Sequence, residues 1–297
     1  MSSPAVTDIL LTGGNGQVGT EIIRQAPASL NIVAPGRAEL DIGDPEAIAT
    51  LVASRPWAAV INCAAHTAVD LAQTEVSAAW KANALGPAAF AEATAKAGIP
   101  LIQVSTDYVF DGAKDGFYAE TDPVAPVSVY GASKEGGEQA VRTANPRHVI
   151  LRTAWVVSPH GKNFVKTMLR LAETRPHLTV VDDQRGCPTS AGDIATTLLT
   201  ITRRLIDDPQ APTGTYHFVN SGEATWCEFA RAIFEIAAAQ GAPSPSVEGI
   251  TTAQYPTPAR RPANSRLDVT KLVHDYGISP RPWRAALEDI LDTLLRK

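Results

Sequence analysis

A short apolar run that leads into a glycine-rich turn constrains the fold of this chain more than any other feature. Residues 9–12 read ILLT, and the next seven, GGNGQVG, place Gly13, Gly16 and Gly19 three residues apart. An amphipathic stretch follows, so we expect a buried strand at 9–12 and a helix at 17–25. In such a strand–turn–helix the first glycine permits a tight turn, the second lets backbone approach a pyrophosphate, and the third lets the helix pack on the strand, while the helix N-terminus offers free N–H groups. We predict a dinucleotide-binding loop; a glycine-rich connector without a ligand is the alternative.

The alternation of short apolar runs and helical patterns continues to about residue 155. Asp44 before Pro45 is a typical helix N-cap, and Gly86-Pro87 predicts a break within a longer helix. Strand–helix alternation predicts an α/β fold with a Rossmann-type doubly wound parallel sheet, covered by helices on both faces. We expect further strands at 31–34, 59–62, 101–105 and 148–153, and helices at 45–54, 75–96 and 129–143 and, further on, at 163–174 and 226–240.

The stretch VAPGRAELDI, at the end of the second expected strand, bears on the choice of cofactor. An acidic residue at this strand end would bind the ribose 2′-OH of NAD, whereas an arginine favours the 2′-phosphate of NADP. No carboxylate ends the strand, and Arg37 follows it closely. A guanidinium binds phosphate through two parallel hydrogen bonds, so we predict a preference for NADPH; a solvated loop charge is the alternative. Asp41 either caps a helix or contacts the adenine side.

The composition of the sequence changes after Trp155, where proline and glycine become frequent. The proline-rich segment 240–264 is expected to lack regular structure. We therefore divide the chain into an NADP(H)-binding Rossmann domain at 1–155 and a smaller α/β lobe, mainly substrate-binding, at 156–297. Residues 182–205 are expected to return to the first domain.

A hydroxyl, a phenol and an amine occur where a nucleotide-dependent reductase needs them. The expected strand at 101–105 runs into STDYVFDG, and residues at strand carboxyl ends face the ligand crevice of an open α/β sheet, so Thr106 and Asp107 should lie near a nicotinamide. The stretch VYGASKEGGE puts Tyr130 and Lys134 four residues apart, on one face of a helix. A carbonyl that receives hydride must also take a proton, and a nearby ammonium lowers the pKa of a phenol from about 10. We predict that Thr106, Tyr130 and Lys134 deliver a proton together and that Lys134 also bonds the cofactor ribose; a chance pair on an exposed helix is the alternative.

Composition excludes several other classes of protein. The chain has 297 residues and a formal net charge of −5, so nothing indicates bulk attraction to nucleic acid or to an anionic membrane. No run approaches 20 apolar residues, and the start, MSSPAVTDILLTGG, lacks the basic-then-apolar pattern of a signal peptide. The three cysteines are widely spaced, and the six histidines show no zinc-ligand spacing. We expect a cytoplasmic protein that binds neither nucleic acid nor membrane.

Taken together, these motifs resemble the extended short-chain dehydrogenase/reductase superfamily and, within it, the dTDP-4-dehydrorhamnose reductases. The matching stretches follow the family's order over nearly the whole chain. They are GGNGQVG (13–19), INCAAHTAVDLAQTE (61–75), STDYVFDG (105–112), PVSVYGASKEGGE (126–138), LRTAWVV (151–157), DDQRGCPT (182–189) and TPARRPANSRLD (257–268).

The resemblance implies an NADPH-dependent reduction of the C4 keto group of dTDP-4-dehydro-L-rhamnose to dTDP-L-rhamnose, for polysaccharide biosynthesis, with NADH as the alternative cofactor. Tyr130 is then the proton donor, Lys134 its partner and Thr106 the hydroxyl that tunes it. With the glycine loop and Arg37, the candidate cofactor contacts are Gly13, Gly16, Gln17, Val18, Gly19, Arg37, Asp41, Ile42, Ala65, His66, Thr67, Val104, Tyr130 and Lys134. The candidate contacts to the nucleotide-sugar substrate are Thr106, Asp107, Trp155 and Arg261. The alternatives are a core residue for Trp155, a loop residue for His66 and a surface charge for Arg261.

Two departures from the family's pattern concern a polar contact and a metal. The family often has a tyrosine after WV, where this chain has Val157, so one polar contact is expected to be absent. Some members bind Mg²⁺ through carboxylates as they form homodimers. Glu21 matches one such position, Asp193 could replace a glutamate at another, and Asp292 lies only near the third. The sequence leaves both the Mg²⁺ and the homodimer open.

Two other functions are compatible with the same fold. An epimerase or dehydratase would hold NAD tightly and recycle its hydride, and Asp107 beside Thr106 does not exclude it. Arg37 and the stretch ARRPANS favour the reductase. A non-catalytic regulatory or binding subunit could lose the three proton-delivery residues, and all three are present.

Overall fold

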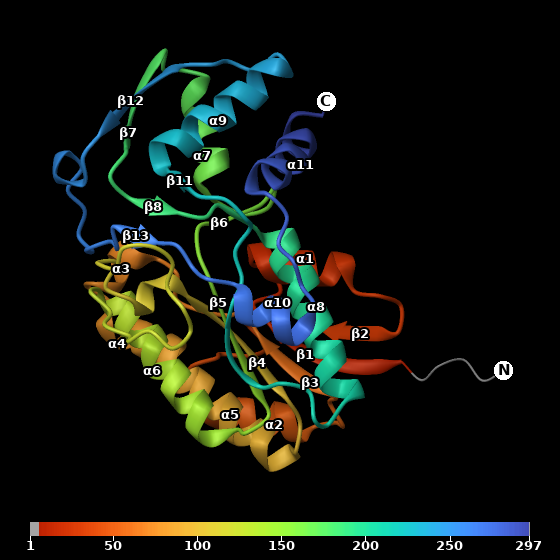
Figure 1. The fold of residues 1–297 in the computed structure, drawn as a ribbon. Coiled ribbons are helices and arrows are strands. Elements are labelled where there is room, and N and C mark those ends of the chain that lie inside the picture. The colour runs from red at the N-terminus through yellow and green to blue at the C-terminus, as the bar shows by residue number, and fades with distance from the viewer. Residues whose placement is uncertain (1–5, 297) are drawn as a thin grey trace.

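The computed structural model describes residues 6–296, and its centre is a six-stranded parallel sheet in the order β10-β5-β4-β3-β1-β2 (Figure 1). Residues 1–5 and 297, which include part of the N-terminal stretch read for a signal peptide, lie outside the described residues. The chain forms β2 on one side of β1 and β3 on the other, so a crevice opens at the carboxyl ends of β1 and β3. The strands are β1 (Thr7–Thr12), β2 (Leu30–Val33), β3 (Ala59–Asn62), β4 (Leu101–Thr106), β5 (His148–Thr153) and β10 (Gly214–His217). The predicted Rossmann-type α/β fold is confirmed.

Helices cover both faces of this sheet because each strand is apolar on both sides. Along β1, Ile9 and Leu11 belong to the core beneath α1 (Gln17–Gln25) and α8 (Ala191–Asp207). Between them, Leu10 faces the opposite core, beneath three other helices. These helices are α2 (Pro45–Ala53), α5 (Gly86–Ala97) and α6 (Val129–Ala144).

Two predictions about the ends of these helices are confirmed. Helix α1 has the predicted bounds, and Asp44 caps α2 by accepting hydrogen bonds from the backbone N–H groups of Glu46 and Ala47 at 3.0 and 3.1 Å. Elements that follow residue 155 in sequence also join this layer: β10 pairs with β5, and α8 packs on α1. Among the helices described, none is long and apolar enough to cross a lipid bilayer.

The segment predicted as one helix with a break at Gly86-Pro87 is organised differently. It consists of α4 (Val76–Trp80), a π-helical turn η1 (Lys81–Leu85) and α5, and a short helix α3 (Val69–Ala72) precedes it. Pro87 has no N–H to donate to the carbonyl four residues earlier, so the α-helical ladder is interrupted there. The wider π turn absorbs this interruption without ending the helix.

A second core is formed by α7 (Phe164–Ala172), α9 (Trp226–Ala239) and α11 (Trp283–Leu295). The expectation of irregular structure throughout 240–264 is wrong, because β12 (Ser246–Ile250) pairs in parallel with β7 (His177–Val181). The prolines of this segment flank β12 instead of interrupting it. The smaller elements are η2 (Asp107–Val109), β6 (Val156–Val157), β8 (Arg185–Gly186), β9 (Thr189–Ser190), β11 (Ala224–Thr225), η3 (Thr252–Gln254), β13 (Asn264–Ser265) and α10 (Thr270–Tyr276).

Candidate active site

The glycine loop joins β1 to α1 at the crevice, and its glycines are required by close approaches. Gly13 has φ +74°, and a Cβ there would come within 2.8 Å of the backbone nitrogen of Ala64. A Cβ at Gly19 would come within 2.2 Å of the carbonyl oxygen of Gly13. Gly16 is the N-cap residue of α1, with no side chain over the helix N-terminus. The loop therefore leaves backbone N–H groups open to an anion.

Two contiguous cavities, of about 650 and 530 Å³, open on either side of this loop. We call them the first and second cavities; Gly13, Gly16, Ala65 and Thr67 line both. The first cavity is also lined by Arg37, Asp41, Ile42 and His66. The second is also lined by Gln17, Val18, Gly19, Val104, Thr106, Asp107, Tyr130, Lys134 and Trp155. The fold thus gathers all candidate cofactor contacts along one continuous space.

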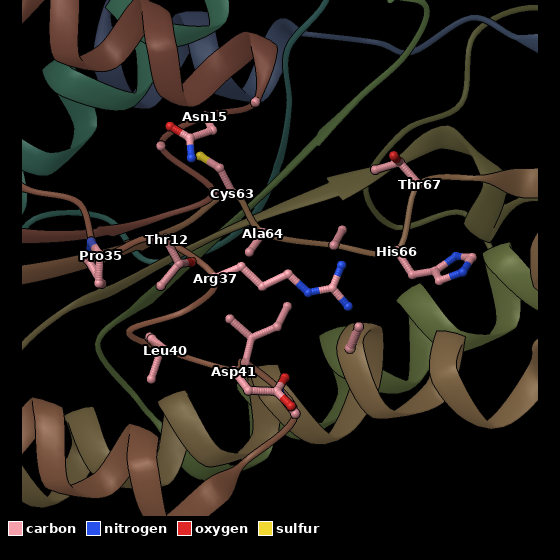
Figure 2. Close-up of a pocket in the computed structure, with 18 of the residues that line it drawn as sticks. Thr12, Asn15, Pro35, Arg37, Leu40, Asp41, Cys63, Ala64, His66 and Thr67 are labelled. Atoms are coloured by element: carbon pink, nitrogen blue, oxygen red, sulfur yellow. The ribbon is translucent and has the colours of Figure 1, made fainter. Parts of the chain in front are cut away.

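Arg37 points into the first cavity, between Asp41 and the chain that carries Ala64 and His66 (Figure 2). Asp41 accepts a hydrogen bond from the backbone N–H of Gly43 at 2.9 Å, and this bond, together with Lys81 and Arg37, lowers the pKa of its carboxyl group. Asp41 is therefore an anion held at the rim of a positively charged cavity.

Lys81 is a further cation of the first cavity that the sequence did not single out. Its Nζ lies 3.7 Å from Oδ2 of Asp41, and its aliphatic stem lies so close to Gly43 that a Cβ there would come within 2.6 Å of it. Lys81 is the first residue of the π-helical turn η1. Helical periodicity does not reveal where a π-helical turn lies, so no sequence pattern marks Lys81 as a residue of this cavity.

Asn83, also in η1, connects the loop at residues 65–67 to α6. Its side chain accepts a hydrogen bond from the backbone N–H of His66 at 2.8 Å and donates to the carbonyl of His66 at 3.1 Å. It also donates to Oγ of Ser133, between Tyr130 and Lys134, at 3.0 Å. The structure thus assigns His66 a backbone role in holding the 65–67 loop. No sequence motif marks Asn83 as a residue of the site.

The second cavity brings together Thr106, at the end of β4, with Tyr130 and Lys134 on α6. Burial raises the pKa of Tyr130 to about 12, against the effect of a hydrogen bond with Thr106. The expectation that Lys134 lowers this pKa is wrong in this structure. Nζ of Lys134 donates instead to the carbonyl oxygen of Val104 at 2.7 Å. Burial lowers the pKa of Lys134 to about 8, although the nearby Glu138 carboxylate opposes this.

Asp107 lies beside Thr106 in a nearly water-free position. Its Oδ1 accepts a hydrogen bond from the Thr106 hydroxyl at 3.0 Å, and burial raises the pKa of the Asp107 carboxyl group to about 6. Four buried polar atoms at the two cavities lack a hydrogen-bond partner among the described residues: Nδ1 of His66, Oγ of Ser105, Oδ2 of Asp107 and Oγ1 of Thr153. Because unpaired buried polar groups are costly, their concentration here indicates a site built for a polar ligand.

Trp155 packs in an aromatic stack and also lies at the wall of the second cavity. Its ring stacks on Trp226 with centroids 3.6 Å apart, and a Cβ at Gly186 would come within 2.4 Å of it. It remains partly exposed to the cavity and has φ +50°, the one positive φ among the described non-glycine residues. The aromatic stack fixes the ring, and the ring forms part of the cavity wall.

Arg261 lies outside these two cavities, at a third one of about 520 Å³. Its guanidinium pairs with Asp70 at 2.8 Å, and this pairing leaves the side chain partly exposed. Arg260 and Tyr255 line the same space. Arg261 therefore lies beside a carboxylate and away from Thr106, Tyr130 and Lys134, and its contact with a substrate stays a prediction.

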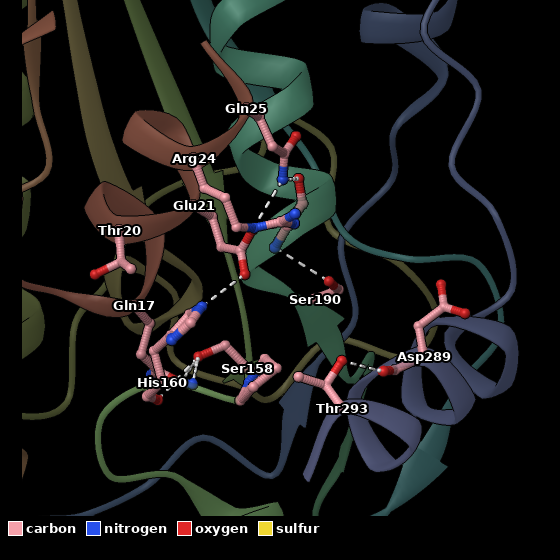
Figure 3. A network of polar contacts seen from close by, with 12 residues as sticks. Gln17, Thr20, Glu21, Arg24, Gln25, Ser158, His160, Ser190, Asp289 and Thr293 are labelled. Carbon is pink, nitrogen blue, oxygen red and sulfur yellow. Dashed lines mark hydrogen bonds and ion pairs between the residues drawn. The ribbon is translucent and has the colours of Figure 1, made fainter. Parts of the chain in front are cut away.

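The carboxylates considered as Mg²⁺ ligands have other partners. Glu21 is paired with Arg24 at 2.7 Å and with Nε2 of His160 at 3.1 Å (Figure 3). Asp193 pairs with Arg281 at 2.9 Å, and Asp292 accepts a hydrogen bond from Gln240 at 2.8 Å. Across residues 6–296 no three His, Cys, Asp or Glu side chains converge as a metal site would require. Cationic side chains neutralise Glu21 and Asp193, so these residues do not fit a Mg²⁺ site.

The same network fixes a loop at the rim of the second cavity (Figure 3). Oε1 of Gln17 accepts hydrogen bonds from Ser158 at 2.9 Å and from Asn163 at 2.8 Å. Lys162, on this loop, lines the second cavity and forms no ion pair with any described carboxylate. The side-chain oxygen of Gln17 therefore holds the loop, and the contact of Gln17 with a dinucleotide stays a prediction.

Comparison with known proteins shows the family to which the chain belongs. The model described as "RmlD substrate binding domain" matches residues 7–296. A relative from Sinorhizobium fredii named dTDP-4-dehydrorhamnose reductase is 44% identical over 288 residues, covering 97% of each chain. A solved dTDP-4-dehydrorhamnose reductase ortholog from Clostridium acetobutylicum has a TM-score of 0.92 at 37% identity, covering 98% of this chain and 100% of that one. Another, from Bacillus anthracis in complex with NADP, has a TM-score of 0.89 at 33% identity, covering 97% and 99%. The chain therefore belongs to the RmlD family of dTDP-4-dehydrorhamnose reductases.

Proposed function

We propose that this protein reduces the C4 keto group of dTDP-4-dehydro-L-rhamnose to dTDP-L-rhamnose with NADPH. The observation that carries the proposal is the placement of Thr106, Tyr130 and Lys134 in one cavity that continues into the glycine loop. The activity printed for the relatives and the NADP complex of the Bacillus anthracis neighbour support the same assignment. The buried unpaired polar atoms along the two cavities fit a long polar ligand such as a dinucleotide.

The glycine loop and the N-terminus of α1 would hold the pyrophosphate of the cofactor. Arg37 would bind the 2′-phosphate, which distinguishes NADPH from NADH. When bound, the cofactor supplies a hydride to the carbonyl carbon. The protein's own residues then have one task at the reacting atoms, which is to place and protonate the carbonyl oxygen.

Tyr130 would donate that proton. A phenol with a pKa of about 12 is fully protonated near neutral pH, so it is present as the acid before the reaction begins. As the carbonyl carbon gains the hydride, the oxygen takes the phenolic proton, and solvent later returns a proton to the phenolate. Thr106 would orient the carbonyl oxygen by a hydrogen bond. Lys134 would bond the cofactor ribose through its ammonium.

The test is a coupled assay with purified protein. The substrate dTDP-4-dehydro-L-rhamnose is generated from its 4-keto-6-deoxyhexose precursor by a competent epimerase, and NADPH oxidation is followed by absorbance. We expect oxidation that depends on both the epimerase and this protein, with dTDP-L-rhamnose as the product. A folded protein that leaves NADPH unoxidised in the presence of the ketosugar would overturn the proposal. An epimerase or dehydratase would give a sugar product without net oxidation of NADPH.

A further inference from the structure

Thr153, the last residue of β5, carries a buried hydroxyl without a partner. The residue is 5% exposed, and its Oγ1 forms no hydrogen bond with any described residue. Other buried threonines of this chain satisfy their hydroxyls locally: Thr94 donates to the carbonyl of Phe90 at 2.6 Å, and Thr202 to that of Leu198 at 2.7 Å. A buried hydroxyl without a partner destabilises a folded protein, so its presence calls for a ligand that completes it.

The position of Thr153 points to the reacting end of the second cavity. Thr153 lines this cavity, and it is the register partner of Thr106 across β4 and β5. Neighbouring strands lie about 4.8 Å apart, and register partners point to the same side of a sheet. The two hydroxyl-bearing side chains are therefore neighbours, and a group that Thr153 binds must adjoin the carbonyl assigned to Thr106.

The face of the sheet identifies which ligand this group belongs to. Val149 and Leu151 lie in the core beneath α1 and α8, and Thr153 follows with the same parity along β5. Val104, whose side chain packs against the same core, also lines the second cavity. Helix α1 is the one whose N-terminus carries the glycine loop. A dinucleotide that leaves this loop would thus run over the face on which Thr153 lies.

We propose that the Thr153 hydroxyl hydrogen-bonds the carboxamide of the nicotinamide ring and so positions that ring against the substrate carbonyl. The assignment rests on the proposed function, because it presumes a nicotinamide dinucleotide. A carboxamide offers both a carbonyl acceptor and an N–H donor, and a hydroxyl can serve either. Thr153 is a binding and positioning residue, and it neither gives nor takes the transferred proton.

The test exploits the cost of the unpaired hydroxyl. In Thr153→Val, a methyl group replaces the hydroxyl at nearly the same volume. We expect the melting temperature of the free protein to rise by about 2 °C, because an unsatisfied polar group is removed. NADPH affinity, measured by titrating its fluorescence, should fall about tenfold, since the ligand's partner is lost. Thr153→Ser keeps the hydroxyl and should retain the affinity for NADPH.

Thr202→Val is the matched control, because it removes a buried hydroxyl that is already satisfied within α8. It should not raise the melting temperature and should leave NADPH binding unchanged. If Thr153→Val binds NADPH as tightly as the wild type, the assignment is overturned, and an accompanying rise in KM for the sugar would place the hydroxyl on the hexose instead. A wild-type protein that binds NADPH but reduces no nucleotide sugar would remove the proposed substrate and leave the Thr153 assignment intact.

Discussion

Gly137 of α6 lies directly against the backbone carbonyl of Asn83, so that a Cβ at position 137 would come within 2.2 Å of that oxygen. The neighbouring Gly136 lies against the ring of Trp80, at 2.8 Å from its hypothetical Cβ. The Gly-Gly pair that follows Lys134 therefore permits α6 to dock on α4 and on the π-helical turn η1, and the docking sets the position of Tyr130 and Lys134.

The first prediction is that Gly137→Ala damages both stability and turnover. Backbone cannot yield as a side chain can, so α6 must shift, and we expect a loss of about 1–3 kcal/mol in the free energy of unfolding. The displaced Tyr130 and Lys134 should also lower kcat. Urea denaturation and steady-state kinetics measure the two effects. Gly136→Ala is the matched comparison: the partly exposed Trp80 ring can move, and alanine favours the helix, so it should be nearly neutral. Equal behaviour of the two variants would contradict this account of the packing.

The second prediction separates two phenols that share the site. Tyr108 packs edge-on against Tyr130 with ring centroids 5.4 Å apart, and both line the second cavity. Tyr130→Phe should lower kcat by about 10²-fold or more, because the proton donor is lost, and should leave the Kd for NADPH within about twofold of wild type. Tyr108→Phe should retain most of the activity. If Tyr130→Phe turns over normally, the proton comes from another group.

The architecture and most of the site could be predicted because their signals are local. Gly13, Gly16 and Gly19 mark a turn that few other sequences can form, and the strand ends that follow from the alternation bring Thr106 toward Tyr130. Periodicity places Tyr130 and Lys134 on one helical face. Periodicity does not show how deeply that face is buried or which group accepts the hydrogen bond of the Lys134 ammonium. For this reason the pKa of Tyr130 was predicted to be lowered, whereas burial raises it.

The residues that were missed matter because of hydrogen bonds, made or absent, between groups that lie far apart in the sequence. Asn83 matters because the π turn directs its side-chain amide toward His66 and Ser133. Thr153 matters because its buried hydroxyl has no hydrogen-bond partner among the described residues. Neither fact is encoded in a short stretch of sequence. The strand β12 was missed because the prolines near it were counted as breakers, although they lie beside the strand.

The third prediction concerns cofactor choice at the first cavity. Arg37 forms no ion pair with any described carboxylate, whereas Lys81 is already near Asp41. Arg37→Ala should lower kcat/KM for NADPH at least tenfold and leave that for NADH nearly unchanged, because only NADPH carries the 2′-phosphate. Lys81→Met is the comparison and should change the ratio less. An unchanged NADPH to NADH ratio in Arg37→Ala would show that another group reads the phosphate.

The fourth prediction is that the protein works without a divalent metal ion. Arg24 and Arg281 already neutralise Glu21 and Asp193. Treatment with EDTA followed by dialysis should therefore leave kcat/KM unchanged, and adding Mg²⁺ back should have no effect. A loss of activity that Mg²⁺ restores would mean that these ion pairs open to admit the metal.

The last prediction is a decline of activity in the alkaline range that Lys134 alone explains. Burial disfavours the charged amine and lowers its pKa to about 8, so the ammonium is fully present below this pH and is lost as the pH rises through it. If the ammonium is needed to hold the cofactor ribose, kcat/KM should be level between pH about 7 and 8, above the range in which Asp107 titrates with its pKa of about 6, and should fall above pH about 8. Tyr130, with a pKa of about 12, stays protonated throughout this range. Lys134→Arg provides the control, because a guanidinium keeps its charge across this range. Whatever activity this variant retains should not decline between pH about 8 and 10, and the same decline in both proteins would assign it to another group.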